Sequence, residues 1–105
     1  MHRETKATAI PPSVKAAVAK RDCLNGPATC ILCGKPGMPN AHIVRRSHGG
    51  MGVEQNIVSL CPDCHRELDE GKDSTMLMEI VVEYIKGFYP DWAPESVTYK
   101  KWRVL

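Results

Sequence analysis

Four cysteines form two C-x2-C pairs, Cys30 with Cys33 and Cys61 with Cys64. A tight turn can bring each pair onto one ion, and four thiolates complete a tetrahedral zinc site that has no open position. The spacing therefore predicts a structural zinc ion, which stabilises a chain but does not catalyse. A redox dithiol and a set of buried free cysteines are the alternatives. The fifth cysteine, Cys23, is expected to be a small apolar residue at a helix end.

Polar residues between and just after these pairs could bind a cation or move a proton. His65 and Asp69 are spaced i, i+4, so on a helix their imidazole and carboxylate could share a divalent cation. His42 and Asn56 lie between the two cysteine pairs. Taken singly, these are a solvated helix face, a structural histidine and a turn residue. Their joint order within a zinc-bound unit favours a functional site.

Two strands and a helix are expected to position these residues. The β-branched Ile43 and Val44 favour a short strand over residues 41–45. A second apolar run favours a strand over 57–60, and the glycines between the two runs allow the chain to return. A helix is predicted over 62–70, with a proline in its first turn.

The flanking segments carry weaker signals. Residues 1–12 resemble a loose leader, and a short helix is expected over 14–21 with Ser13 as its N-cap. A longer amphipathic helix is predicted over 74–86, ending at the glycine that follows. The tail, 88–105, holds both tryptophans and is expected to pack on the core.

The length of 105 residues fits a single domain with three parts. These are a leader with a short helix (1–29), a zinc-binding core (30–71), and a helix with an aromatic tail (72–105). The net charge of +2 requires any nucleic-acid-binding patch to be local. No apolar run could span a bilayer, and the charged first residues do not resemble a signal peptide, so a cytoplasmic location without membrane contact is expected.

The run 30–71 closely resembles the HNH nucleases, especially zinc-stabilised forms encoded by phages and prophages. Its motifs follow in order: C-x2-C, His-Ile, Arg-Ser-x-Gly-Gly, Asn-Ile-Val and Leu-Cys-x2-Cys-His. Arg21 and Asp22, upstream of the first cysteine pair, are also typical of this family. The resemblance implies an α+β fold: a small ββα-metal core with the four-cysteine zinc site, flanked by N- and C-terminal helices. It also implies hydrolysis of phosphodiester bonds in DNA.

The resemblance implies a role for each candidate residue. His42 would be the general base that activates water, and Asn56 would fix the loop that carries His42. His65 and Asp69 would hold a catalytic divalent cation, Mg²⁺, Mn²⁺ or Ni²⁺, and His65 thereby counts among the catalytic residues. The products implied are a 5′-phosphate and a 3′-hydroxyl.

One position departs from the family pattern. The residue before the base is commonly His or Asp, which serves as another metal ligand, but here it is Ala41, which cannot ligate. Asn40 or Asp63 could contribute instead, although spacing establishes neither.

Three basic residues follow the base, namely Arg45, Arg46 and His48. They are expected to contact DNA phosphates. Since alternate residues of a strand face opposite sides, only one of the two arginines is expected to face the DNA.

The favoured function is a metal-dependent HNH endonuclease that acts on DNA. The alternative is a catalytically inactive, zinc-stabilised nucleic-acid-binding module, as Ala41 suggests. A structural or protein-interaction zinc domain would leave His42, Asn56 and His65 unexplained. The resemblance alone suggests phage packaging proteins as partners and a bacterial or phage-infected host cell as the location, while the oligomeric state is unknown.

Overall fold

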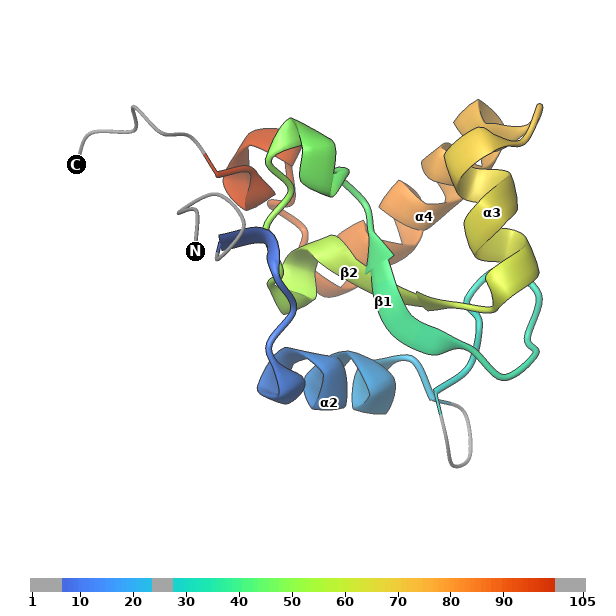
Figure 1. Cartoon of the computed structure of the whole chain (residues 1–105), viewed down its shortest axis with the longest axis horizontal. Helices are drawn as coiled ribbons and strands as arrows, with labels where there is room; N and C mark the ends of the chain where they lie inside the picture. The colour runs from blue at the N-terminus through green and yellow to red at the C-terminus, as the bar shows by residue number, and fades with distance from the viewer. Residues whose placement is uncertain (1–6, 24–27, 100–105) are drawn as a thin grey trace.

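The computed structural model describes residues 7–23 and 28–99. A two-stranded antiparallel sheet lies at its centre, and the second strand leads directly into a helix (Figure 1). The elements in chain order are α2 (Pro12–Arg21), β1 (Met38–His42), the 3-10 helices η1 (Arg46–His48) and η2 (Glu54–Asn56), β2 (Ile57–Leu60), α3 (Pro62–Glu70), α4 (Ser74–Phe88) and the 3-10 helix η3 (Pro94–Val97). The predicted α+β class with a strand–strand–helix core is confirmed. None of the helices in the described residues is long and apolar enough to cross a membrane.

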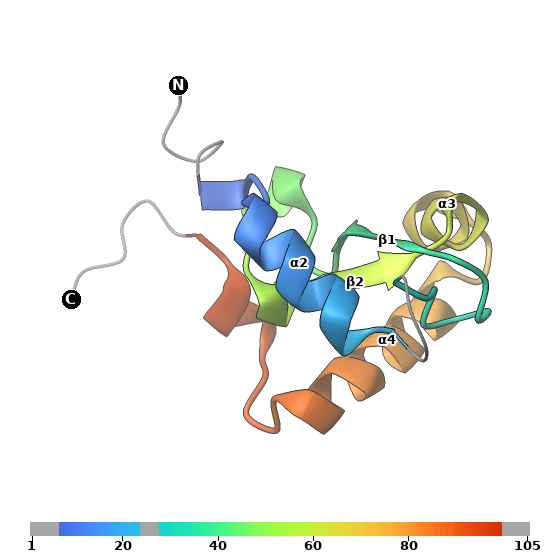
Figure 2. The ribbon, with the colours of Figure 1, turned by 90° about the horizontal axis from the view of Figure 1, so that it is seen from below.

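The helices lie around the sheet in two groups. Helix α2 packs across both strands, as the view from below shows (Figure 2). Helix α3 packs against β2 and α4. The register pairs Ala41 with Val58 and His42 with Ile57. Because side chains alternate along a strand, this register directs Ala41 and His42 to opposite faces of the hairpin.

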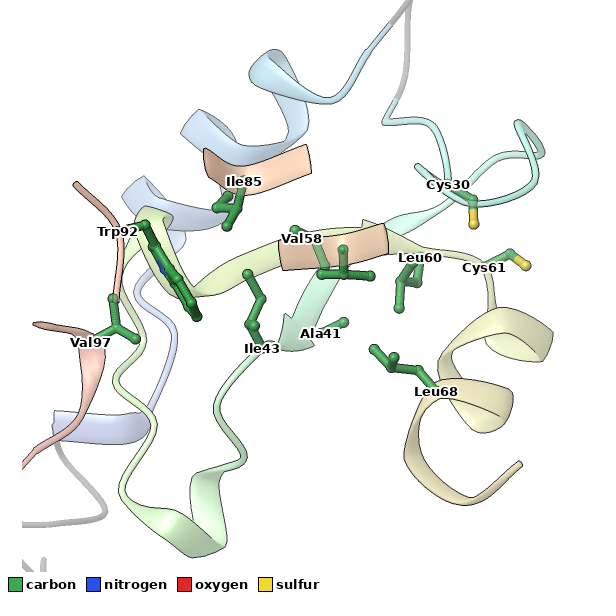
Figure 3. Packing of buried hydrophobic residues seen from close by; sticks show 11 residues of the cluster. Cys30, Ala41, Ile43, Val58, Leu60, Cys61, Leu68, Ile85, Trp92 and Val97 are labelled. Atoms are coloured by element: carbon green, nitrogen blue, oxygen red, sulfur yellow. The ribbon is translucent and has the colours of Figure 1, made fainter. Parts of the chain in front are cut away.

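The apolar core lies between the sheet and α4. Val58 and Leu60 of β2 meet the buried side chains of Val81 and Ile85, and Leu68 of α3 closes one end (Figure 3). Further members come from β1 and the residue after it, the two cysteine-containing segments and the tail: Ala41, Ile43, Cys30, Cys61, Trp92 and Val97. Trp92 also donates a hydrogen bond from Nε1 to the carbonyl of Gln55 at 2.8 Å. Residues 100–105, which include Trp102, lie outside the described residues.

The first strand differs from its prediction. It spans Met38–His42 rather than 41–45, so the β-branched Ile43 and Val44 lie beyond its end. The amide of Asn56 accepts a hydrogen bond from Val44 N–H at 2.8 Å and donates one to its carbonyl at 3.2 Å. These bonds take both backbone groups of Val44 out of a strand ladder, which local propensity could not reveal.

Two helix ends also differ, whereas the predicted strand 57–60 and helix 62–70 are confirmed. Helix α2 begins at Pro12, its N-cap residue is Pro11, and no side chain caps it, so Ser13 is not the cap. Helix α4 continues through Gly87 to Phe88, whose ring contacts Tyr84 one turn earlier with centroids 5.1 Å apart. Such i, i+4 aromatic packing offsets the cost of a helical glycine, which is about 1 kcal/mol.

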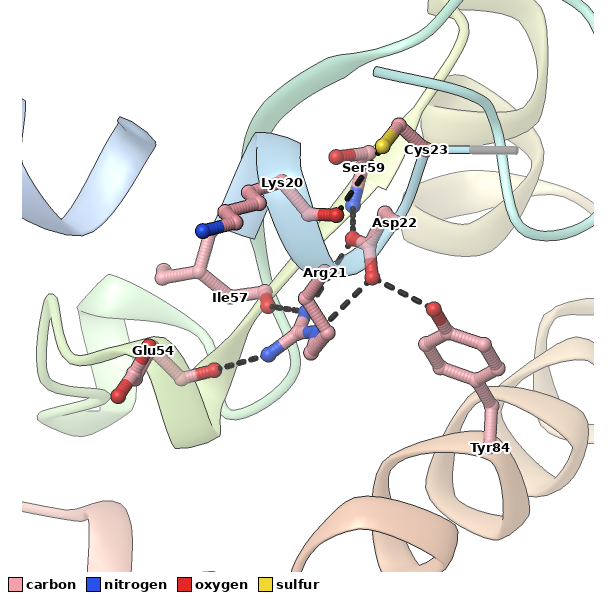
Figure 4. A network of polar contacts seen from close by, with 8 residues as sticks. All are labelled: Lys20, Arg21, Asp22, Cys23, Glu54, Ile57, Ser59 and Tyr84. Carbon is pink, nitrogen blue, oxygen red and sulfur yellow. Dashed lines mark hydrogen bonds and ion pairs between the residues drawn. The ribbon is translucent and has the colours of Figure 1, made fainter. Parts of the chain in front are cut away.

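A buried charged pair joins α2 to the rest of the molecule (Figure 4). Arg21 Nε lies 2.8 Å from Asp22 Oδ1, and both side chains are almost fully buried. Arg21 also donates to the backbone carbonyls of Glu54 and Ile57. Asp22 accepts from the N–H of Ser59 at 2.8 Å and from the hydroxyl of Tyr84 at 2.6 Å. The pair therefore links α2 with η2, β2 and α4.

Burial and neighbouring charges shift the pKa values of Arg21 and Tyr84 in this network. Burial opposes a charged Arg21, but the hydrogen bond and the charge of Asp22 raise the pKa of Arg21 above its ordinary value. Burial and the Asp22 carboxylate raise the pKa of Tyr84. Arg21 thus stays a cation and Tyr84 a hydrogen-bond donor across the working pH range.

We predict that Asp22→Ala lowers the free energy of unfolding by about 3–5 kcal/mol, because it leaves the Arg21 charge buried without its partner. Chemical denaturation of the zinc-loaded protein measures this change. The matched control is Asp63→Ala, which removes an exposed carboxylate 2.8 Å from Arg66 and should cost less than about 1 kcal/mol. Equal losses in the two variants would contradict the central role of the buried pair.

Candidate functional site

The four cysteines of the two C-x2-C pairs gather at the end of the hairpin next to α3. The Sγ atoms of this cysteine quartet (Cys30, Cys33, Cys61 and Cys64) all lie within 4.8 Å of one another. The Sγ atoms of Cys33 and Cys61 are 3.6 Å apart. A tetrahedral zinc ion with Zn–S bonds of about 2.3 Å requires sulfur atoms about 3.8 Å apart. The quartet therefore fits a zinc ion in both donor type and spacing.

Local backbone geometry shapes the quartet. Gly34 follows Cys33 with φ 81°, a left-handed conformation that suits glycine and turns the chain back. Cys61 precedes α3 as its N-cap residue and accepts a hydrogen bond from Cys64 N–H through Sγ at 3.4 Å. Burial opposes ionisation of Cys30, yet nearby backbone N–H groups lower the pKa of its thiol to about 7. Cys23 lies apart, and its Sγ contacts the carbonyl of Lys20.

A cleft of about 590 Å³ is lined by residues of the upstream segment, α2, β1, η1 and α3. We call it the histidine cleft because His42 of β1 and His65 of α3 both line it. Its remaining lining residues come from the upstream segment, β1, η1 and the end of α3: Ala9, Ile10, Lys15, Asn40, Arg45, Arg46, Ser47, Asp69 and Glu70. The cleft thus gathers basic, acidic and imidazole groups from segments far apart in sequence.

His42 is half-buried in this cleft, and its Nε2 lies 2.9 Å from the carbonyl oxygen of Thr8. A carbonyl only accepts hydrogen bonds, so Nε2 carries the proton in this contact, and in a neutral ring the lone pair is on Nδ1. Burial lowers the pKa of His42, and the positive charges of Arg46 and His65 add to this effect, while the Thr8 carbonyl opposes it. The environment therefore favours the neutral imidazole near pH 7, the form that can accept a proton.

Asn56 lies fully buried beneath the loop that follows His42. Besides its two bonds with Val44, its Nδ2 donates to the carbonyl of Met51 at 2.9 Å. Its own carbonyl accepts from Ile43 N–H at 2.8 Å. These contacts fix the chain immediately after His42 and close the loop between residues 44 and 51.

His65 and Asp69 face each other one turn apart on α3. His65 Nε2 lies 3.4 Å from Asp69 Oδ2, and both side chains are partly exposed in the cleft. Two donors alone make an incomplete cation site. Among the described residues, the quartet is the one group of three or more His, Cys, Asp or Glu donors close enough to share an ion.

The structure separates the residues considered as further ligands. Ala41 is fully buried within the apolar core and does not line the cleft. Asn40, on the other strand face, lines the cleft, and its buried Oδ1 finds no hydrogen-bond partner within the described part of the chain. Asp63 pairs with Arg66 and does not line the cleft. Of Asn40 and Asp63, Asn40 is therefore the better placed.

That only one of the two arginines faces the DNA stays a prediction, but the structure gives the position of both relative to the cleft. Arg45 and Arg46 both line the cleft, because the chain has left the strand before residue 45. Arg45 Nη2 donates to the carbonyl of Asp69 at 2.6 Å, and Arg46 Nε donates to Thr8 Oγ1 at 3.2 Å. His48 is exposed in η1 but does not line the cleft.

Sequence reasoning missed two contributors, Lys15 of α2 and Thr8. Lys15 lines the cleft from an exposed position, and Thr8 reaches His42 from a segment that was expected to be a loose leader. That expectation is wrong for residues 7–10, since Ala7 and Thr8 make hydrogen bonds to the rest of the molecule and the next two residues line the cleft. No local sequence signal places either residue at the cleft, since both positions arise from tertiary packing.

Comparison with known proteins gives consistent results. The model of the HNH endonuclease family matches residues 30–71. The type IV methyl-directed restriction enzyme EcoKMcrA of Escherichia coli (strain K12) is 32% identical, over 67% of this chain and 27% of that protein.

A solved structure, that of the type IV phosphorothioation-dependent restriction endonuclease ScoMcrA, superimposes with a TM-score of 0.59. Sequence identity is 23%, and the match covers 83% of this chain and 21% of the other. This likeness supports the fold. The chain spans about a quarter of the length of either relative.

We predict that Cys61→Ser protein loses its bound zinc and melts at least about 10 °C lower, because zinc-site binding energy is folding energy. Elemental analysis and thermal denaturation measure the two effects. Cys23→Ser is the matched control, since this cysteine lies outside the quartet, and it should keep both the zinc and the melting temperature. Full zinc content in the Cys61 variant would contradict a four-thiolate site.

Proposed function

We propose that this chain is a metal-dependent endonuclease that hydrolyses phosphodiester bonds of DNA, because the model of the HNH endonuclease family matches residues 30–71. The observation that carries the proposal is the histidine cleft. It places a half-buried neutral imidazole, a His–Asp pair and basic side chains around one concave surface.

His42 is the proposed general base, taking a proton from the attacking water. Its lowered pKa keeps the ring neutral, and the lone pair on Nδ1 is the proton acceptor when Thr8 holds Nε2–H. Asn56 acts through the loop rather than on substrate, because its amide binds Val44 and Met51 instead of facing the cleft. We therefore assign Asn56 a positioning role.

His65 and Asp69 are the proposed ligands of a divalent cation, Mg²⁺, Mn²⁺ or Ni²⁺, and the amide oxygen of Asn40 is a candidate third ligand. Such a cation supplies charge that polarises the scissile phosphate and stabilises the leaving 3′ oxygen. The quartet would hold a second, structural Zn²⁺, with no role in the chemistry because four thiolates leave no open position.

DNA is the proposed substrate, and its backbone phosphates would lie against Lys15, Arg45 and Arg46 on the rim of the cleft. His48, exposed in the same loop region, would contact phosphates further along the strand. The names of the two relatives refer to methyl-directed and phosphorothioation-dependent restriction, but the matches cover only 27% of one relative and 21% of the other. The proposal therefore names DNA as the substrate and does not specify a chemical modification of that DNA.

The competing function is a zinc-stabilised module that binds DNA without cutting it. Ala41 favours this alternative, since the usual ligand at that position is missing. Phage packaging partners and a location in the cytoplasm of a bacterial or phage-infected cell stay predictions from family resemblance.

We predict that the protein nicks plasmid DNA when Mg²⁺, Mn²⁺ or Ni²⁺ is added and not when EDTA is present. His42→Ala should reduce the rate by at least about 100-fold, the contribution typical of general base catalysis. Gel analysis of supercoiled and nicked plasmid measures the rate.

Asp63→Ala is the matched control, because it removes an exposed side chain that pairs with Arg66 and does not line the cleft. Its rate should stay within about threefold of the parent protein. Salt-sensitive DNA retention without cleavage in any cation would favour the binding module, and nicking that survives His42→Ala would exclude His42 as the base.

The dependence of cleavage on pH should reflect the lowered pKa of His42. The active form is the neutral ring, so kcat should rise with pH along an acidic limb and level off above the pKa. Because burial and nearby positive charge lower this pKa, the midpoint should lie below 6.5, the ordinary value. Rates at saturating cation across pH 4.5 to 8 measure it, and Arg46→Gln should move the midpoint upward. A midpoint above 6.5 in the parent protein would contradict the assignment.

A further inference from the structure

The segment 7–10, which we call the upstream strap, lies against the histidine cleft although it precedes the family-matched residues. Ala7 accepts a hydrogen bond from Gly52 N–H at 3.1 Å, and Thr8 accepts one from Arg46 Nε at 3.2 Å. Thr8 is only 2% exposed, and the next two residues of the strap line the cleft. The strap is therefore packed into the site.

The contact between the strap and the Gly52 loop leaves no spare room. A Cβ atom at Gly52 would lie 1.9 Å from the carbonyl oxygen of Ala9 and 3.0 Å from Cα of Ile10. Gly52 does not have a positive φ, so its backbone does not itself require glycine. The need for glycine comes from the close approach of the strap.

The strap also provides the hydrogen-bond partner of the proposed base. The Thr8 carbonyl oxygen lies 2.9 Å from His42 Nε2. It belongs to the backbone, so it is present whatever side chain occupies position 8. Since it can only accept, it fixes which ring nitrogen carries the proton and limits rotation of the ring.

We propose that the upstream strap is part of the active site, and that the Thr8 carbonyl positions the His42 imidazole through Nε2–H so that Nδ1 is the basic nitrogen. Thr8 is then a positioning residue and not a catalytic one. The strap also forms one wall of the cleft through Ala9 and Ile10. The catalytic meaning of this inference rests on the proposed function, whereas the contact itself is measurable without any cleavage.

Gly52→Ala tests the proposal because the added methyl displaces the strap. The His42 ring N–H signal, assigned by its loss in His42→Ala, should be resolved in the NMR spectrum of the zinc-loaded parent protein. In the variant it should disappear through exchange with water. We also expect kcat to fall by about 10- to 100-fold with little change in KM, as for a displaced catalytic group.

The matched control is Gly87→Ala, which makes the same chemical change where the added Cβ meets no atom within 4 Å apart from its chain neighbours and the backbone of its own helix. It should keep the ring N–H signal and the rate of the parent protein. Loss of the signal in this control as well would overturn the assignment of the effect to the strap.

A second variant weakens the acceptor without adding bulk, at the expense of the backbone N–H of residue 9. Cys23 permits chemical ligation of a synthetic 1–22 peptide, in which lactate replaces Ala9 and an ester replaces the amide after Thr8. An ester carbonyl is a weaker acceptor, and the methyl group of position 9 is retained. Faster exchange of the His42 ring N–H and a lower kcat than in the ligated all-amide protein would support the proposal, even if Gly52→Ala does not fold.

The outcomes separate this inference from the proposed function. If the parent protein cuts no DNA but shows the strap-dependent ring N–H signal of His42, the positioning contact stands and the proposed nuclease function is refuted. A folded ester variant with unchanged ring exchange and unchanged kcat would overturn the inference while leaving the nuclease intact.

Discussion

The buried pair of Arg21 and Asp22 is the interaction on which the rest of the structure depends. Two charges removed from water are destabilising unless every donor and acceptor finds a partner. Here each does, and the partners lie on η2, β2 and α4. Because the guanidinium binds the carbonyls of Glu54 and Ile57, α2 is fixed beside the start of β2, next to Asn56. A network of this kind specifies one arrangement of helices around a hairpin that is too short to specify it alone.

The two ends of the hairpin are held by different chemistry. At one end the cysteine quartet joins the segment before β1 to the segment after β2, and two of its members, Cys30 and Cys61, lie within the apolar core. At the other end Asn56 closes the loop that follows His42. His42 lies between these supports, while His65 directly follows Cys64, the last residue of the quartet. The separation between the proposed base and the proposed cation ligands is therefore set by both supports together.

Local signals in the sequence predicted most of this core and little of what surrounds it. The cysteine spacing, β2 and α3 could be predicted because turn residues, apolar runs and helix-start signals act within a few residues. The end of β1 could not, since the side chain of Asn56 takes over the backbone of Val44. The strap and Lys15 could not either, because their place beside His42 follows from how α2 packs. The errors thus arise where long-range hydrogen bonds override local preference.

Ala41 takes on a different meaning once strand alternation is considered. Its side chain is fully buried with the apolar core, opposite the face that carries His42. A carboxylate or imidazole at this position would be buried among apolar groups without a partner, at a cost of several kcal/mol. An alanine here suits the apolar packing of β1, and a strand ligand for the proposed cation would have to lie on the cleft face. Asn40 lies on that face with an amide oxygen that still lacks a partner within the described residues, which makes it the position where this chain would compensate for the departure.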